Sequence, residues 1–217
     1  MISNKPLLFT HIPRAAGTSI VASLGGPRIR HVPYNKNSSI LQIRHEPLSL
    51  LATLNNLDDF FKFAIVRNPY TRAYSLYKSA WAFRAARNFP PKPLNATNVC
   101  LERDTTFTEF LKRIKARFDQ VDDTDFSFPT TRFLCFLAYS QTFFVTDKDN
   151  NILSDKIYHH ENLSEYETDF NRKLSMTNNM SYTSEDYYAD YTLEAIDLVK
   201  EIYEKDFNNF GYSFDFK

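Results

Sequence analysis

The sequence has few of the residues that build disulfide-linked or cysteine-ligated metal folds. Its two cysteines, Cys100 and Cys135, show neither CxxC spacing nor another metal-ligand pattern. A disulfide framework and a cysteine-rich zinc site are therefore excluded. We expect two free thiols in a reducing compartment.

Long apolar runs are missing as well. The start of the chain, MISNKPLLFTHIP, has neither the basic and apolar regions of a signal peptide nor a run of about twenty apolar residues. We therefore expect a cytoplasmic protein with no membrane partner.

Neither sign of charge is in excess. Lysine and arginine total 26, and aspartate and glutamate total 26, so no global field attracts nucleic acid or an anionic membrane. Any anion site must be local. With 43% hydrophobic and 24% charged residues, the 217-residue chain has the composition and length of one soluble globular domain, residues 1–217.

Two segments have the pattern of a strand, a tight turn and a helix. The apolar run PLLFTHI, residues 6–12, predicts a buried strand, and GTSIVASLGG predicts a short helix that ends at Gly25 and Gly26. FFKFAIV, residues 60–66, predicts a second strand. Pro69 can then begin a helix with Asn68 as its N-cap.

The other segments predict further helices and strands. Residues 27–57 suggest an irregular connection with helical pieces, and residues 141–160 suggest two strands around a polar turn. Thr106 and Glu109 have the spacing of a capping box. A C-terminal helix that Gly211 ends is predicted by one apolar stripe, made of Leu193, Ile196, Val199, Tyr203, Phe207 and Phe210.

Together these segments predict an α/β fold. We expect a three-layer core with a central parallel sheet flanked by helices. In such folds the bound molecule lies beyond the carboxyl ends of the strands. Two segments that could bind an anion follow predicted strands at these ends.

The first of these segments is HIPRAAGTS, residues 11–19. Gly17 and the hydroxyls of Thr18 and Ser19 come at a predicted helix start, where N–H groups without intrahelical partners favour an anion. A triphosphate loop of pattern GxxxxGK[ST] has a lysine before the hydroxyl residue, whereas this chain has Gly17 there and a cation at Arg14. From this segment alone, an anion-binding loop and a capped turn remain equally good interpretations.

The second segment, VRNPYTRAYSLY, residues 66–77, favours the anion-binding interpretation. Arg67 closes the second predicted strand, and Ser75 lies eight residues later in the second turn of the next helix. A guanidinium and a hydroxyl at a strand end can share one phosphate. Arg72 is three residues before Ser75 and so shares its helix face.

The two segments together resemble the sulfotransferases that use 3'-phosphoadenosine 5'-phosphosulfate (PAPS), in the branch of glycan O-sulfotransferases and bacterial family 2 members. In that family a loop similar to HIPKxxGTS binds the 5'-phosphosulfate, and an RxPxxRxxSxY segment binds the 3'-phosphate. This chain has HIPRAAGTS and RNPYTRAYSLY in the same order. KIYHHENL and the predicted C-terminal helix are similar too, so the resemblance covers most of the chain.

The resemblance implies a P-loop-like core, PAPS as the co-substrate, no metal, and sulfuryl transfer to a hydroxyl acceptor, with a saccharide as the expected substrate. It assigns the 3'-phosphate to Arg67 and Ser75. It assigns the 5'-phosphosulfate to six loop residues, Arg14, Ala15, Ala16, Gly17, Thr18 and Ser19. The family has lysine where this chain has Arg14, which can stabilise charge on the leaving phosphate but is a poor proton donor.

Sulfuryl transfer also needs a base for the acceptor hydroxyl, and histidine has the most suitable pKa. Glycan sulfotransferases of this branch have a catalytic histidine between the two PAPS motifs, so the resemblance points to His45 in LQIRHEPL. Glu46 is the alternative because some relatives use a carboxylate. A loop histidine without a role also remains open.

Two other function classes compete with this hypothesis. A P-loop kinase of small molecules is disfavoured by the missing Lys-Ser/Thr pair and by the lack of an evident magnesium carboxylate after a second strand. A binding module for 3'-phosphoadenosine 5'-phosphate (PAP) or a glycan, without catalysis, is suggested by Arg14 in place of the family lysine.

Overall fold

The computed structural model describes residues 5–25, 40–44, 47–54, 57–85, 105–119, 138–174 and 183–217. The chain divides into two compact units, one of residues 1–68 and 141–177 and the other of residues 69–140 and 178–217. The chain thus leaves the first unit after Asn68 and re-enters it at Gln141. A single domain over residues 1–217 stays a prediction.

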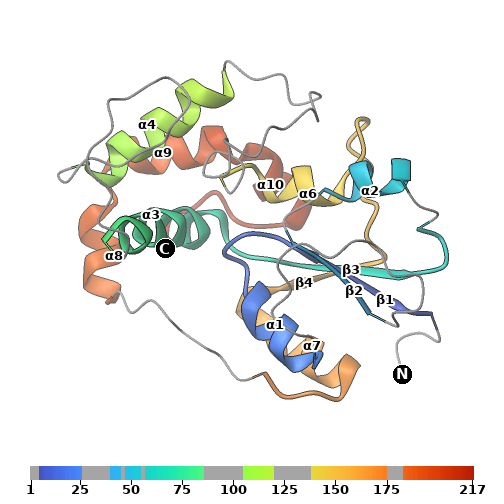
Figure 1. Cartoon of the computed structure of the whole chain (residues 1–217). Coiled ribbons are helices and arrows are strands. Elements are labelled where there is room, and N and C mark those ends of the chain that lie inside the picture. The colour runs from blue at the N-terminus through green and yellow to red at the C-terminus, as the bar shows by residue number, and fades with distance from the viewer. Residues whose placement is uncertain are drawn as a thin grey trace. The chain divides into compact units, whose positions relative to one another are not determined.

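The first unit contains a parallel sheet of four strands in the order β2-β1-β3-β4 (Figure 1). The register pairs His11 with Arg44, and Val66 with His159. Because the strands are parallel, their carboxyl ends lie at one edge of the sheet, as predicted. The strands are β1 (Leu7–His11), β2 (Ile40–Arg44), β3 (Phe61–Val66) and β4 (Lys156–His159).

Helices cover both faces of this sheet. Neighbouring residues of β1 point to opposite faces, and both faces carry apolar side chains that must be buried. Phe9 packs in one cluster with Ile20 and Tyr166, and Leu8 packs in another with Leu48. Figure 1 shows α1 and α7 next to each other, and these two helices supply the Ile20 and Tyr166 that pack with Phe9. Helix α6 contacts α2. The predicted parallel sheet flanked by helices is confirmed. The helices of this unit are α1 (Gly17–Ser23), α2 (Leu48–Leu54), α6 (Gln141–Val145), the 3-10 helix η2 (His160–Asn162) and α7 (Leu163–Phe170).

The described part of the second unit is helical with an aromatic core. Tyr74 packs edge-on against Phe107, with ring centroids 5.4 Å apart. Helix α4 lies along α9 (Figure 1). The predicted capping box is confirmed, since the Thr106 N–H donates to Glu109 Oε2 at 3.0 Å and the Glu109 N–H donates to Thr106 Oγ1 at 3.3 Å. The helices are α3 (Pro69–Ala85), α4 (Phe107–Phe118), α8 (Ser184–Asp190), α9 (Leu193–Ile202) and α10 (Glu204–Phe210).

Two predicted elements of the first unit are wrong. The first of the two strands predicted in residues 141–160 is instead helix α6, and around the polar turn only residues 146 and 152 pair, in an isolated bridge. A strand, β2, lies within the predicted irregular connection. Both segments have only five residues, too few for periodicity to separate helix from strand.

The C-terminal stripe is only partly correct. It spans two helices that meet at Tyr203, and Gly211 ends the second with a left-handed φ of 68°. Leu193 is 82% exposed, because the N-cap at Thr192 starts α9 in a phase that turns Ala195 and Val199 to the core instead. None of the helices that the structure describes is long and apolar enough to span a bilayer.

Candidate active site

The segment after β1 is a turn with two left-handed residues. Arg14 has a φ of 65° and Ala16 a φ of 61°, a backbone region that costs a residue with a side chain about 1–2 kcal/mol. The N–H groups of Ser19 and Ile20 donate to the Ala16 carbonyl at 2.9 and 3.2 Å. Helix α1 begins at once with Gly17. Arg14 is therefore held in a defined turn at the carboxyl edge of the sheet.

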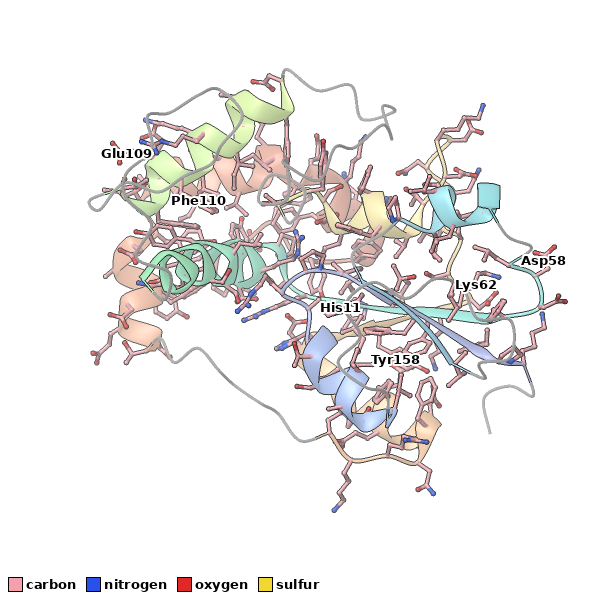
Figure 2. All side chains as sticks on the ribbon, viewed as in Figure 1. His11, Asp58, Lys62, Glu109, Phe110 and Tyr158 are labelled. Carbon is pink, nitrogen blue, oxygen red and sulfur yellow. The ribbon has the colours of Figure 1, made fainter. Side chains whose placement is uncertain are left out.

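Gly17 lies against the imidazole of His11, the last residue of β1. Figure 2 shows His11 at the opposite end of the sheet from Lys62 and Asp58. A Cβ at residue 17 would lie 1.8 Å from both Nε2 and Cδ2 of His11. Residue 17 must therefore be glycine as long as the His11 ring keeps its place. The requirement comes from this close approach and not from a left-handed backbone conformation.

Arg67 connects the second motif to the first. It directly follows β3, and its Nη1 donates to the carbonyl oxygen of Arg14 at 3.4 Å. Both side chains are half-buried. The structure thus brings the Arg67 guanidinium to the backbone of Arg14, at the edge where β1 and β3 end.

Two distant side chains hold the backbone at Arg67. Gln141, fully buried at the start of α6, accepts from the Arg67 N–H through Oε1 at 2.7 Å and donates from Nε2 to the Arg67 carbonyl at 2.8 Å. Glu161 Oε1 accepts from the Asn68 N–H at 2.8 Å. Three consecutive backbone polar groups are therefore fixed by side chains.

His160 also lies near Arg67, in η2 directly after β4. Burial and the positive charge of Arg67 lower the pKa of His160 from its ordinary value of 6.5, and the nearby Glu161 carboxylate only partly opposes them. The lowered pKa favours the neutral form of His160, in which the ring nitrogens include one donor and one acceptor.

The comparison with protein families decides the assignment. The model of the sulfotransferase family matches residues 1–213, a range that contains both motifs and extends into both units. The chain belongs to the sulfotransferase family. Neither the curated proteins nor the solved structures gave a match. Family membership makes this protein a transferase of the sulfotransferase type, as the two motifs predict.

In this sulfotransferase the six predicted loop residues lie in the turn and in the first residues of α1. Ala15, Gly17 and Ser19 are buried, Thr18 is exposed, and Ala16 is half-buried. One direct contact between the motifs is the hydrogen bond from Arg67 Nη1 to the Arg14 carbonyl oxygen. Among the residues that the structure describes, no group of three or more His, Cys, Asp or Glu is arranged to hold a metal ion.

The rest of the second motif belongs to the second unit. Ser75 is 2% exposed and Arg72 is 1% exposed. Arg72 Nη2 donates to the Tyr139 carbonyl at 2.9 Å, and its guanidinium carbon lies 5.7 Å from the centroid of the Tyr203 ring. Arg72 therefore supports the core of the second unit. The joint role of Arg67 and Ser75 stays a prediction.

The predicted base lies outside the described residues, as does its alternative Glu46. His45 directly follows β2, whose last residue Arg44 pairs with His11. The catalytic role of His45 stays a prediction.

Sequence reasoning missed Gln141 and the half-buried position of His160 beside Arg67. Gln141 is 74 residues from its partner Arg67, and Glu161 is 93 residues from Asn68. A local pattern cannot show such contacts. The one available signal was KIYHHENL, whose polar HHEN follows a strand that can end at the same edge.

Proposed function

We propose that this sulfotransferase transfers the sulfuryl group of PAPS to a hydroxyl group, with a saccharide as the acceptor. The observation that supports this proposal most directly is the contact of Arg67 with the Arg14 turn. The resemblance of the two motifs to those of PAPS-dependent sulfotransferases implies that they hold the two charged ends of PAPS, and the chain belongs to the sulfotransferase family.

In the proposed reaction, the acceptor oxygen attacks the sulfur of PAPS in line with the bond to the 5'-phosphate. A new S–O bond forms to the acceptor, the S–O bond to the phosphate breaks, and its electron pair stays on the phosphate of PAP. His45 takes the acceptor proton, with Glu46 as the alternative base. The turn after β1 acts as a P-loop-like cradle for the 5'-phosphosulfate, through Arg14 and residues 15–19.

Arg14 stabilises the charge that grows on the leaving phosphate. A guanidinium is suited to this because it stays protonated at all relevant pH values and donates two parallel hydrogen bonds to phosphate oxygens. Such stabilisation is most effective when the donor is positioned before the reaction, and the left-handed turn holds the backbone of Arg14. Arg67 and Ser75 bind the 3'-phosphate.

Calorimetry with PAP and, separately, with ATP and magnesium tests the donor. We expect the protein to bind PAP in preference to ATP and Arg67→Ala to weaken binding of PAP. Preference for ATP with magnesium, together with magnesium-dependent ATP hydrolysis, would instead support a kinase and contradict the proposal.

Transfer is tested separately, with PAPS and a panel of saccharide hydroxyl acceptors. Release of PAP coupled to a sulfated product supports the full proposal. PAP binding without transfer to any acceptor would favour the non-catalytic binding module, for which Arg14 in place of the family lysine is the motivating feature.

A further inference from the structure

Gln141 makes an unusually complete contact with Arg67. Both polar ends of its side chain bond the same residue: Oε1 accepts from the Arg67 N–H at 2.7 Å, and Nε2 donates to the Arg67 carbonyl at 2.8 Å. The side chain is fully buried. Loss of this pair would leave buried polar groups of both residues without these partners, at a cost that water cannot readily offset.

The contact lies where strand pairing stops. β3 pairs with β1 up to Ala64 and with β4 up to Val66. A primary amide has the donor and acceptor of a peptide group, so Gln141 continues the pairing of β3 by one residue. Glu161 then holds the next N–H, that of Asn68, at 2.8 Å.

The group that gains from this arrangement is the Arg67 side chain. A long, flexible arginine binds a phosphate more tightly when its starting point is fixed, because less conformational freedom is lost on binding. The Arg67 guanidinium already contacts the Arg14 carbonyl at 3.4 Å. Fixing the Arg67 backbone therefore also restricts how the Arg67 guanidinium reaches the Arg14 carbonyl.

We propose that Gln141 is a positioning residue for 3'-phosphate recognition, acting through Arg67. This inference rests on the proposed function, in which Arg67 binds the 3'-phosphate. Gln141 is also the residue at which the chain re-enters the first unit, so the competing explanation is a purely structural tie. The two differ in one measurable property, the preference for PAP over adenosine 5'-phosphate (AMP), which lacks the 3'-phosphate.

The first test compares Gln141→Met with Thr146→Val. Methionine keeps the length of glutamine but forms neither hydrogen bond. Thr146 is a matched control in the next turn, buried and bonded from Oγ1 to the Thr142 carbonyl at 2.9 Å. The Kd values for PAP and AMP are measured by calorimetry, and Tm is measured for each variant. We expect Gln141→Met to reduce the PAP preference about tenfold and Thr146→Val to leave it unchanged.

Gln141→Glu is the second variant, in case the methionine variant does not fold. A protonated carboxyl can both accept from the Arg67 N–H and donate to its carbonyl, whereas a carboxylate can only accept. We expect this variant to regain PAP preference, relative to the native protein at the same pH, as the pH is lowered. A constant ratio between the two proteins across the pH range would overturn the inference.

A double-mutant comparison shows whether Gln141 acts through Arg67. In the Arg67→Ala background, Gln141→Met should cause no further loss of PAP preference. If the native protein binds PAP, two results would overturn the inference. One is a further loss of PAP preference in the double variant, and the other is an unchanged PAP preference in Gln141→Met alone. A native protein that does not bind PAP would overturn the proposed function, and this inference with it.

Discussion

The imidazole of His11 occupies the space that a side chain at residue 17 would need. A Cβ on Gly17 would lie 1.8 Å from the His11 Nε2, far inside van der Waals contact. The last residue of β1 and the first residue of α1 therefore determine each other, and the turn that holds Arg14 lies between them.

Gly17→Ala should disrupt this turn. Alanine favours a helix more than glycine does, by about 1 kcal/mol, so any loss of stability must come from the clash with His11. We expect a lower Tm and at least about tenfold weaker PAP binding. His11→Ala removes the ring, and in that background Gly17→Ala should be tolerated. If Gly17→Ala is equally harmful in both backgrounds, the clash is not the cause.

Arg14→Ala should lower kcat more than it weakens binding of PAP, because the proposed role of Arg14 is to stabilise charge in the transition state. The loss should be about a hundredfold or more, as for other groups that stabilise a developing oxyanion. Arg14→Lys, which restores the family residue, should keep most of the activity. Steady-state kinetics with PAPS measures both. Full activity in Arg14→Ala would exclude the role.

The two arginines of the second motif should respond differently to mutation. Arg72→Met removes a buried hydrogen bond to the Tyr139 carbonyl and the contact with the Tyr203 ring. We expect it to lower the free energy of unfolding by about 2–4 kcal/mol, measured by urea denaturation. Arg67→Met should change stability less and PAP affinity more. A fully stable Arg72→Met protein would contradict the core role of Arg72.

His160 should make the protein less stable in mild acid. Its pKa in the folded protein lies below 6.5, the ordinary value expected for the unfolded chain, because of burial and Arg67. Between these two pKa values the unfolded chain binds more protons, so stability falls as the pH falls through this window. The free energy of unfolding is measured by urea denaturation between pH 7 and pH 5, roughly the span of histidine titration. Over this range it should fall less in His160→Gln than in the native protein.

The same pKa can be measured directly by NMR titration of the His160 ring. Arg67→Ala should raise this pKa, since it removes a positive charge, and Glu161→Gln should lower it, since it removes a negative one. Shifts in the opposite directions would contradict the described arrangement of these three side chains.

His45→Ala should lower kcat by about two orders of magnitude and leave PAP affinity unchanged, as for loss of a general base. The pH dependence of kcat/KM should also lose its rising limb near neutral pH. Glu46→Gln is the matched control from the adjacent residue. If Glu46→Gln causes the loss and His45→Ala does not, the carboxylate is the base.

Where the sequence pattern was strong and local, prediction succeeded. The buried run FFKFAIV is strand β3, and the Thr106 and Glu109 capping box begins α4 with the expected hydrogen bonds. Prediction failed for two short segments of five residues, ILQIR and QTFFV. QTFFV is too short to show the 3.6-residue period of a helix. In the structure it is helix α6, which packs against α2.

The sequence by itself determined the sulfotransferase family, the order of the two motifs and a parallel sheet flanked by helices, because these depend on residue types at short, regular spacings. Only the tertiary structure decided that Arg67 contacts the Arg14 turn, that Arg72 supports a core, and that Gln141 holds Arg67 from 74 residues away. A hydrogen bond depends on distance and direction in space. Across such a separation in sequence, only the packing of the strands and helices sets that distance and direction.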